Sequence, residues 1–145
     1  MYANYHTHTY LSNHAIDTPH DYVESALAGG TKLLGFSDHV PYPFANGHPS
    51  GFRIAVADTE RYVSEIAALR GEYADRIRIF IGYEAEYSPD EFAAMLANIR
   101  RFTCDYLILG QHYTNNEYDG VYVYSKTDDR DMLTRYVNQA IAGME

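Results

Sequence analysis

The stretch IRIFIGYEAEY, residues 77–87, predicts a strand and sets the pattern for the chain around it. Ile77, Ile79 and Ile81 alternate with other residues, so their side chains would share one face of a strand. The capping sequence SPDE (88–91) follows directly and predicts the start of a helix. Apolar residues then recur at helical spacing, at Phe92, Met95, Leu96 and Ile99. The next apolar run, YLILGQ (106–111), predicts a strand covered on both faces.

The same alternation of strand and helix extends toward both ends of the chain. Residues 2–7 and 33–37 predict short strands. Thr18 is placed to cap a helix between them, and Asp58 is placed to cap the helix that precedes residues 77–87. A last amphipathic helix is expected over 128–142, with four apolar residues facing inward: Leu133, Tyr136, Val137 and Ile141. This order favours an α/β fold in which parallel strands are joined by helical crossovers.

The composition narrows the possible functions. A chain of 145 residues suits one domain, which we place over residues 1–145. The formal net charge of −9 leaves no basic surface for nucleic acid or for an anionic membrane. No apolar run approaches the roughly 18 residues of a membrane span, and the N-terminus lacks a signal-peptide pattern. A single cysteine excludes an internal disulfide, and we expect a cytoplasmic protein.

Polar side chains lie at the end of each predicted strand. Across the four strands they are His6, His8, Asp38, His39, Glu84, Glu86 and His112. In parallel α/β folds the C-terminal ends of the strands meet, and sites are built there. A mixture of imidazole and carboxylate suits Zn, Mn or Fe better than Ca or Mg. The sequence therefore predicts a transition-metal site at this edge of the sheet.

Each of these residues has an ordinary structural reading as well. A single histidine at a strand end is usually a surface or capping residue, and Asp38 could simply begin a turn. Glu84 and Glu86 could be a solvated pair at a strand end, although two close carboxylates without a cation would repel each other. His20 and His48 are expected to be surface residues outside the site. The coincidence of four strand ends favours the metal site.

Four segments together resemble the PHP (polymerase and histidinol phosphatase) superfamily, and most of all its bacterial histidinol-phosphatase type. They are YHTHTYLSNH (5–14), GFSDH (35–39), IGYEAEY (81–87) and YLILGQHY (106–113), with further similarity over 52–73 and 118–129. The resemblance implies the N-terminal half of a distorted (β/α)7 barrel. It also implies up to three divalent transition metal ions, Zn, Mn or Fe, and hydrolysis of a small-molecule phosphate ester.

The resemblance distributes the ligands over three metal ions. His6 and His8 would hold the first, Glu84 would bridge the first and second, and His112 would hold the second. His14 and His39 would hold the third. A hydroxide bridging two metals would attack phosphorus in line.

In addition to Glu84, two further residues are expected to contribute to catalysis. Asp38 would orient a ligating imidazole. Arg53, in the long loop 38–57, would hold the phosphate through two parallel hydrogen bonds. The competing interpretation of Arg53 is an exposed loop arginine.

Later motifs of the family are absent from this chain: a histidine followed by Pro-Asp, and a pair similar to Asp-Ala-His. We therefore expect a truncated half barrel with open strand edges, through which the chain associates with itself.

The expected substrate of the full-length form is histidinol phosphate. The alternatives are a metal-binding fragment without turnover and a PHP enzyme that acts on another phosphate ester. An amidohydrolase is disfavoured, because Lys32 and Lys126 lie outside the predicted strands.

Overall fold

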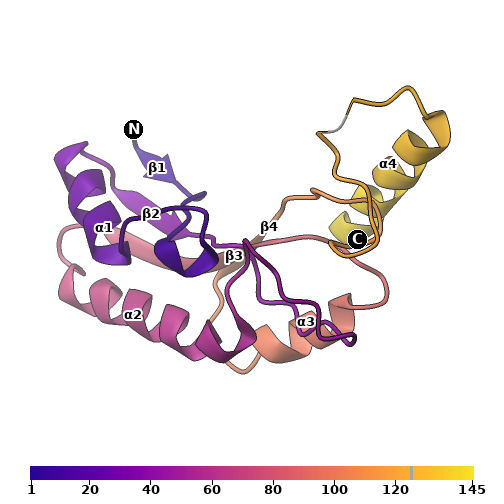
Figure 1. Cartoon of the computed structure of the whole chain (residues 1–145). Helices are drawn as coiled ribbons and strands as arrows, with labels where there is room; N and C mark the ends of the chain where they lie inside the picture. The colour runs from indigo at the N-terminus through magenta and orange to yellow at the C-terminus, as the bar shows by residue number, and fades with distance from the viewer. Residues whose placement is uncertain (125) are drawn as a thin grey trace.

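Four parallel strands form one sheet in the computed structural model, in the order β1-β2-β3-β4 (Figure 1). The structure describes residues 1–124 and 126–145, so Ser125 in the predicted loop before the last helix lies outside it. The strands are β1 (Ala3–Asn4), β2 (Leu33–Phe36), β3 (Arg78–Ala85) and β4 (Tyr106–Leu109). Each neighbouring pair is parallel, which confirms the predicted α/β architecture.

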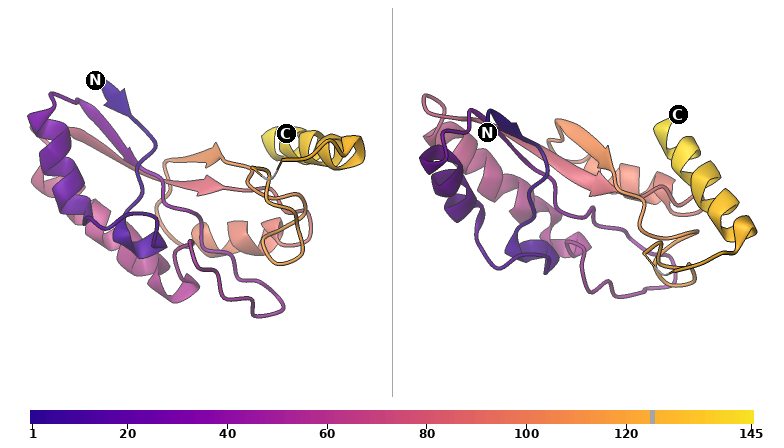
Figure 2. Two further views of the ribbon diagram at one scale, coloured as in Figure 1. Left: turned by 45° about the horizontal axis from the view of Figure 1, so that its top comes forward. Right: turned by 90° about the horizontal axis from the view of Figure 1, so that it is seen from above.

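The main helices are α1 (Pro19–Ala28), α2 (Thr59–Glu72), α3 (Phe92–Ile99) and α4 (Arg130–Met144). Two short 3₁₀ helices, η1 (Tyr10–Ser12) and η2 (Val56–Asp58), lie in the loops. Helices α1 to α3 lie along one side of the sheet, whereas α4 stands apart from them beyond β4 (Figures 1 and 2). Within the described residues, no helix combines the length and apolar character needed to cross a bilayer.

The predicted N-terminal caps of the helices agree only in part with the structure. Thr18 caps α1 as predicted, because its hydroxyl accepts from the Asp21 amide and the Asp21 carboxylate accepts from the Thr18 amide. Asp58 precedes α2 as predicted but makes no side-chain cap, since η2 runs directly into the helix. The predicted capping box at Ser88 is wrong. The Ser88 carbonyl accepts from the amides of Glu91 and Phe92, so a turn forms first and α3 starts at Phe92.

The core lies between β3 and the helices. Ile79, Ile81, Tyr83 and Ala85 alternate along β3, share its helix-facing side and are buried. Burial of each large apolar side chain contributes about 1.5–3 kcal/mol. The Tyr62 hydroxyl, carried by α2, donates to the Gly82 carbonyl at 2.8 Å and so ties the helix to the central strand.

The opposite side of the sheet is crossed by the ring of Tyr106. Its hydroxyl lies within hydrogen-bond distance of the carbonyls of Tyr5 (2.7 Å) and Phe36 (3.0 Å). A Cβ on Gly82 would lie 2.5 Å from this ring, and a Cβ on Gly35 would lie 2.2 Å from its hydroxyl. Both neighbouring strands therefore need glycine where the ring passes.

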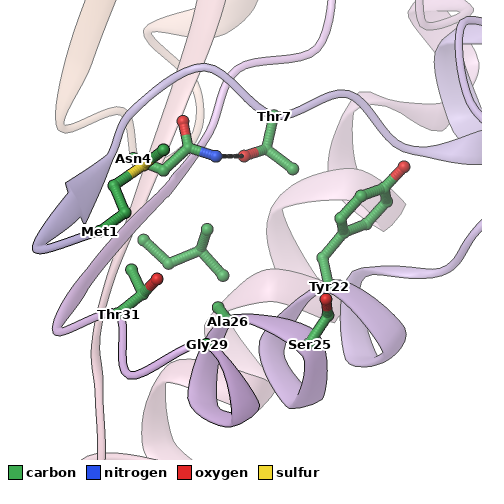
Figure 3. Close-up of a pocket in the computed structure, with 9 residues that line it drawn as sticks. Met1, Asn4, Thr7, Tyr22, Ser25, Ala26, Gly29 and Thr31 are labelled. Atoms are coloured by element: carbon green, nitrogen blue, oxygen red, sulfur yellow. Dashed lines mark hydrogen bonds between the residues drawn. The ribbon is translucent and has the colours of Figure 1, made fainter.

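The first strand is shorter than the predicted 2–7, because it covers only Ala3–Asn4. His6 and His8 lie in the loop that follows β1 rather than on the strand itself. A pocket of about 280 Å³ also opens between β1 and α1, lined by residues that include Met1, Asn4, Thr7 and Tyr22 (Figure 3). The Asn4 amide donates to the Thr7 hydroxyl at its rim (Figure 3).

Two predictions about burial are wrong near the C-terminus. Leu107 on β4 is 42% exposed, so this strand is not covered on both faces. Leu133, Val137 and Ile141 of α4 are also exposed and Tyr136 is only half-buried, while Met132 is buried instead. The reason is that, among the described residues, no element packs on that face of α4.

We expect Gly82→Ala to destabilise the fold by about 1–3 kcal/mol, because the added methyl would displace the Tyr106 ring from a packed position. Gly51→Ala is the matched control, since a Cβ there meets no atom within 4 Å. Urea unfolding of both variants measures the difference. Equal stabilities would contradict this account of how the sheet is packed.

Candidate metal centre

The structure brings together all six side chains predicted as metal ligands: His6, His8, His14, His39, Glu84 and His112. They come from the segments that follow β1, β2 and β4 and from the end of β3 itself. The centroids of neighbouring imidazole rings lie 4.7–5.2 Å apart. We call these six residues the histidine cluster. Their convergence is what the prediction required, and their role as ligands remains a prediction.

The carboxylate of Glu84 lies at the centre of the histidine cluster. Its Oε2 atom is 3.1 Å from His6 Nε2, 3.2 Å from His8 Nε2 and 3.4 Å from His39 Nδ1. Its Oε1 atom is 3.6 Å from His112 Nε2. One buried carboxylate thus faces four imidazoles from three different loops.

The backbone around Glu84 fixes it in this position. Its amide donates to the Asp38 carbonyl at 3.0 Å, and its own carbonyl accepts from Val40 at 2.9 Å, which aligns the loop after β2 with β3. Gly110 leaves room for the carboxylate, because a Cβ at that position would lie 2.0 Å from Glu84 Oε1. The sequence analysis assigned no role to Gly110, although a glycine at a strand end can signal a close approach of this kind.

Three overlapping groups have ligand atoms within 4.8 Å of one another. They are His6, His8 and Glu84; His39, Glu84 and His112; and His8, His14 and His39. Each pair of ligands that the family resemblance implies occurs within one of these groups, but His8, His39 and Glu84 each belong to two groups. The division of the ligands among individual ions therefore remains a prediction.

The donor set fits a divalent transition metal. In the described part of the chain, the buried Nδ1 atom of His39 has no hydrogen-bond partner. Buried polar atoms in native proteins are normally paired, so this nitrogen indicates a missing partner. His39 Nδ1 faces Glu84 across 3.4 Å, and imidazole nitrogen with carboxylate oxygen is a donor set suited to Zn, Mn or Fe.

Burial and charge adjust the protonation of the histidine cluster. Burial lowers the pKa of His39 to about 3, so this imidazole is neutral. Burial would raise the pKa of Glu84, but the nearby imidazoles, above all His8, outweigh it and lower that pKa to about 2. A neutral imidazole and an ionised carboxylate are the forms that bind metals.

Two other histidines are drawn toward the charged form. Burial opposes the charge of His8, but the carboxylates of Asp38 and Glu84 prevail and raise its pKa to about 9. The Glu86 carboxylate raises the pKa of His112. Metal binding would therefore have to release a proton from His8 at neutral pH.

Asp38 lies where an orienting carboxylate would be expected. It is fully buried and accepts hydrogen bonds from the Thr9 amide at 2.7 Å, the Thr9 hydroxyl and the Ser12 hydroxyl at 2.6 Å. Its Oδ1 atom is 3.5 Å from His8 Nδ1. Asp38 thus fixes the segment that connects His8 to His14, while its action on the imidazole remains a prediction.

Arg53 is not the exposed loop arginine of the competing interpretation, because only 4% of it is exposed. Its Nε donates to Glu117 at 2.8 Å and its Nη2 donates to Glu86 at 2.6 Å. Two of its three nitrogens are thus already bonded to carboxylates. Its Nη1 has no hydrogen-bond partner among the described residues. Contact of Arg53 with phosphate remains a prediction.

The remaining two histidines lie outside the histidine cluster, as expected. His20 on α1 is exposed, and its Nε2 lies 3.1 Å from the Tyr73 hydroxyl. His48 is half-buried in the long loop, with its Nε2 3.2 Å from Glu117.

Comparison with known proteins places the chain in one protein family. The family model described as "PHP domain" matches residues 4–144. A protein of Deinococcus radiodurans named "Probable histidinol-phosphatase" is 33% identical over 108 residues, covering 74% of this chain and 41% of that protein. The histidinol-phosphatase of Bacillus subtilis is 35% identical over 86 residues, covering 57% of this chain and 32% of that protein. The chain thus spans between a third and about two fifths of the length of these relatives.

The fold has a counterpart among solved structures. The crystal structure of a histidinol phosphate phosphatase from Lactococcus lactis, complexed with zinc, L-histidinol and phosphate, superimposes with a TM-score of 0.64 at 25% sequence identity. The match covers 77% of this chain and 40% of that one. The four parallel strands therefore correspond to the N-terminal part of such a barrel, which confirms the predicted half barrel.

We expect added Zn²⁺ or Mn²⁺ to raise the thermal unfolding midpoint, by the equivalent of about 2.7 kcal/mol when the metal is at 100 times its dissociation constant. Glu84→Gln should abolish most of this gain, because the carboxylate faces four of the imidazoles. His20→Ala, outside the histidine cluster, is the control and should keep the gain. An equal gain in Glu84→Gln would show that the metal binds elsewhere.

Proposed function

Since the chain belongs to the PHP domain family, we propose that it serves the metal-dependent hydrolysis of a phosphomonoester. The observation that carries this proposal is the Glu84 carboxylate surrounded by imidazoles from separate loops. Such a centre attracts divalent cations, and a dianionic phosphate ester needs cations nearby before water can attack it. On this proposal, residues 1–145 form part of one such catalytic domain.

We propose histidinol phosphate as the substrate, which water would convert into histidinol and phosphate. The names of the relatives support this choice, as does the Lactococcus lactis structure, which was solved with zinc, L-histidinol and phosphate. The metal would be Zn, Mn or Fe, and the cytoplasmic location remains a prediction.

We propose roles for the chain's own residues on the pattern that the family resemblance implies. Bound divalent ions would screen the phosphoryl charge and acidify a water molecule. His6 and His8 would hold one ion, Glu84 would be shared with a second at His112, and His14 and His39 would hold a third. Asp38 would keep the segment between His8 and His14 in place through its bonds to Thr9 and Ser12.

A metal-binding chain without turnover is the second candidate, and one observation favours it. The side chain of His6 is 48% exposed and His14 is also exposed, so water reaches one side of the histidine cluster. Electrostatic stabilisation of a transition state is weaker where water screens it. Hydrolysis of another phosphate ester is the third candidate, because the metal centre recognises the phosphoryl group whatever alcohol it carries.

We expect release of inorganic phosphate from histidinol phosphate when Mn²⁺ or Zn²⁺ is added to the purified chain. Glu84→Gln should reduce the rate by about 100-fold or more, since loss of even a supporting group at a metal site costs 10–100-fold. His20→Ala should leave the rate unchanged. Bound metal without release from any phosphate ester tested would favour the non-catalytic candidate.

We also propose that the chain associates with a second copy through α4 and the β4 edge. Leu133, Val137 and Ile141 recur every four residues on one face of α4, and Val137 is 50% exposed. Leu107 adds an exposed apolar side chain on β4, which is an edge strand of the sheet that the structure describes. Exposed apolar faces of this kind are typical of interaction surfaces.

Sedimentation equilibrium is expected to show a dimer. Val137→Lys should shift the chain toward the monomer, because a charge in the centre of an apolar contact is costly to bury. Asn138→Lys is the control, since it adds the same charge at the next exposed position of α4. A monomer at all concentrations would contradict this proposal and leave the proposed chemistry intact.

A further inference from the structure

We propose that Glu86 is a positioning residue for His112 and that Arg53 holds Glu86 in place for this role. The inference rests on the proposed metal centre. It goes beyond that centre because neither side chain lies in the histidine cluster, and it gives Arg53 a role other than contact with phosphate.

Glu86 connects the end of β3 to the segment after β4. It is two residues beyond Glu84, so the extended backbone directs both carboxylates to the same side. Glu86 is only 3% exposed. Its Oε1 atom lies 3.5 Å from His112 Nδ1, and its Oε2 atom accepts from the backbone amide of Tyr113 at 3.3 Å. The carboxylate thus contacts both the ring of His112 and the peptide that follows it.

The two nitrogens of His112 face different carboxylates. Nδ1 faces Glu86, whereas Nε2 lies 3.6 Å from Glu84 Oε1 at the centre of the histidine cluster. A proton kept on Nδ1 by Glu86 leaves the lone pair of Nε2 for a cation beside Glu84. Carboxylates that hold the far nitrogen of a ligating imidazole fix both its tautomer and its orientation.

Arg53 makes a buried carboxylate possible at this position. Its Nη2 donates to Glu86 Oε1 at 2.6 Å, and its Nε donates to Glu117 at 2.8 Å. The guanidinium lies over the rings of Phe52 and Tyr42, with its central carbon 4.7 Å and 5.1 Å from their centroids. Removing the cation from a buried ion pair is strongly destabilising, so Glu86 needs Arg53 as its partner.

This arrangement gives the long loop after β2 a specific task. Arg53 comes from that loop, Glu86 from the end of β3, and Glu117 from the loop after β4. The pairs Arg53–Glu86 and Arg53–Glu117 therefore fasten both loops next to His112. A purely structural ion pair would stabilise the fold in the same way, but it would not change the affinity for metal specifically through His112.

Zn²⁺ affinity measured by competition with a chromophoric chelator tests the proposal on the full chain. Glu86→Gln keeps the shape but removes the charge, and it should weaken the affinity of the site containing His112 by about 10–100-fold. Arg53→Lys keeps the positive charge without the two-pronged contact and should weaken the same site. Asp105→Asn is the matched control, because it neutralises a carboxylate paired with Arg70 away from the histidine cluster and should leave affinity unchanged.

The decisive comparison is made in a His112→Ala background. There Glu86→Gln should cause no further loss, since its effect acts through that imidazole. If Glu86→Gln folds poorly, the visible absorption of Co²⁺ bound to Arg53→Lys reports on the imidazole ligand directly, and a spectrum identical to that of the parent chain overturns the proposal.

Three results overturn this inference alone: unchanged Zn²⁺ affinity in Glu86→Gln, an equal loss with and without His112, or an unchanged Co²⁺ spectrum in Arg53→Lys. Failure of the unaltered chain to bind Zn²⁺ is a different result. That result would contradict both the proposed function and this inference.

Discussion

The architecture of the site depends on the buried carboxylate of Glu84. The Glu84 carboxylate stays ionised at the end of the central strand because imidazoles surround it, and its pKa falls to about 2. Among the described residues, the buried Nδ1 atom of His39, which faces this carboxylate, has no hydrogen-bond partner. Unpaired buried polar groups of this kind are typical of functional sites.

The scaffold achieves this with a few close contacts. Gly110 leaves the space that the Glu84 carboxylate fills, and Gly35 and Gly82 leave the space that the Tyr106 ring fills. Asp38 fixes the segment after β1 by accepting from Thr9 and Ser12. These contacts bring loops distant in sequence to one edge of the sheet, as parallel α/β folds generally do.

The periphery of the chain is built differently from its centre. Helices α1 to α3 cover one side of the sheet, and their buried residues form one continuous core with β2 and β3. Helix α4 keeps an apolar face exposed, and β4 keeps Leu107 exposed. The structural match covers 77% of this chain and about two fifths of the relative.

The sequence by itself determined the order of strands and helices, the parallel sheet and the residues of the histidine cluster. Periodicity, the Thr18 cap and the polar residues at strand ends are local signals, and the family motifs are local as well. Only the tertiary structure decided that Arg53 is buried between two carboxylates, that Ser88 forms a turn instead of a cap and that α4 exposes its apolar face. Burial and pairing depend on segments far apart in the chain, such as the contact of Arg53 with Glu117, and local patterns do not specify them.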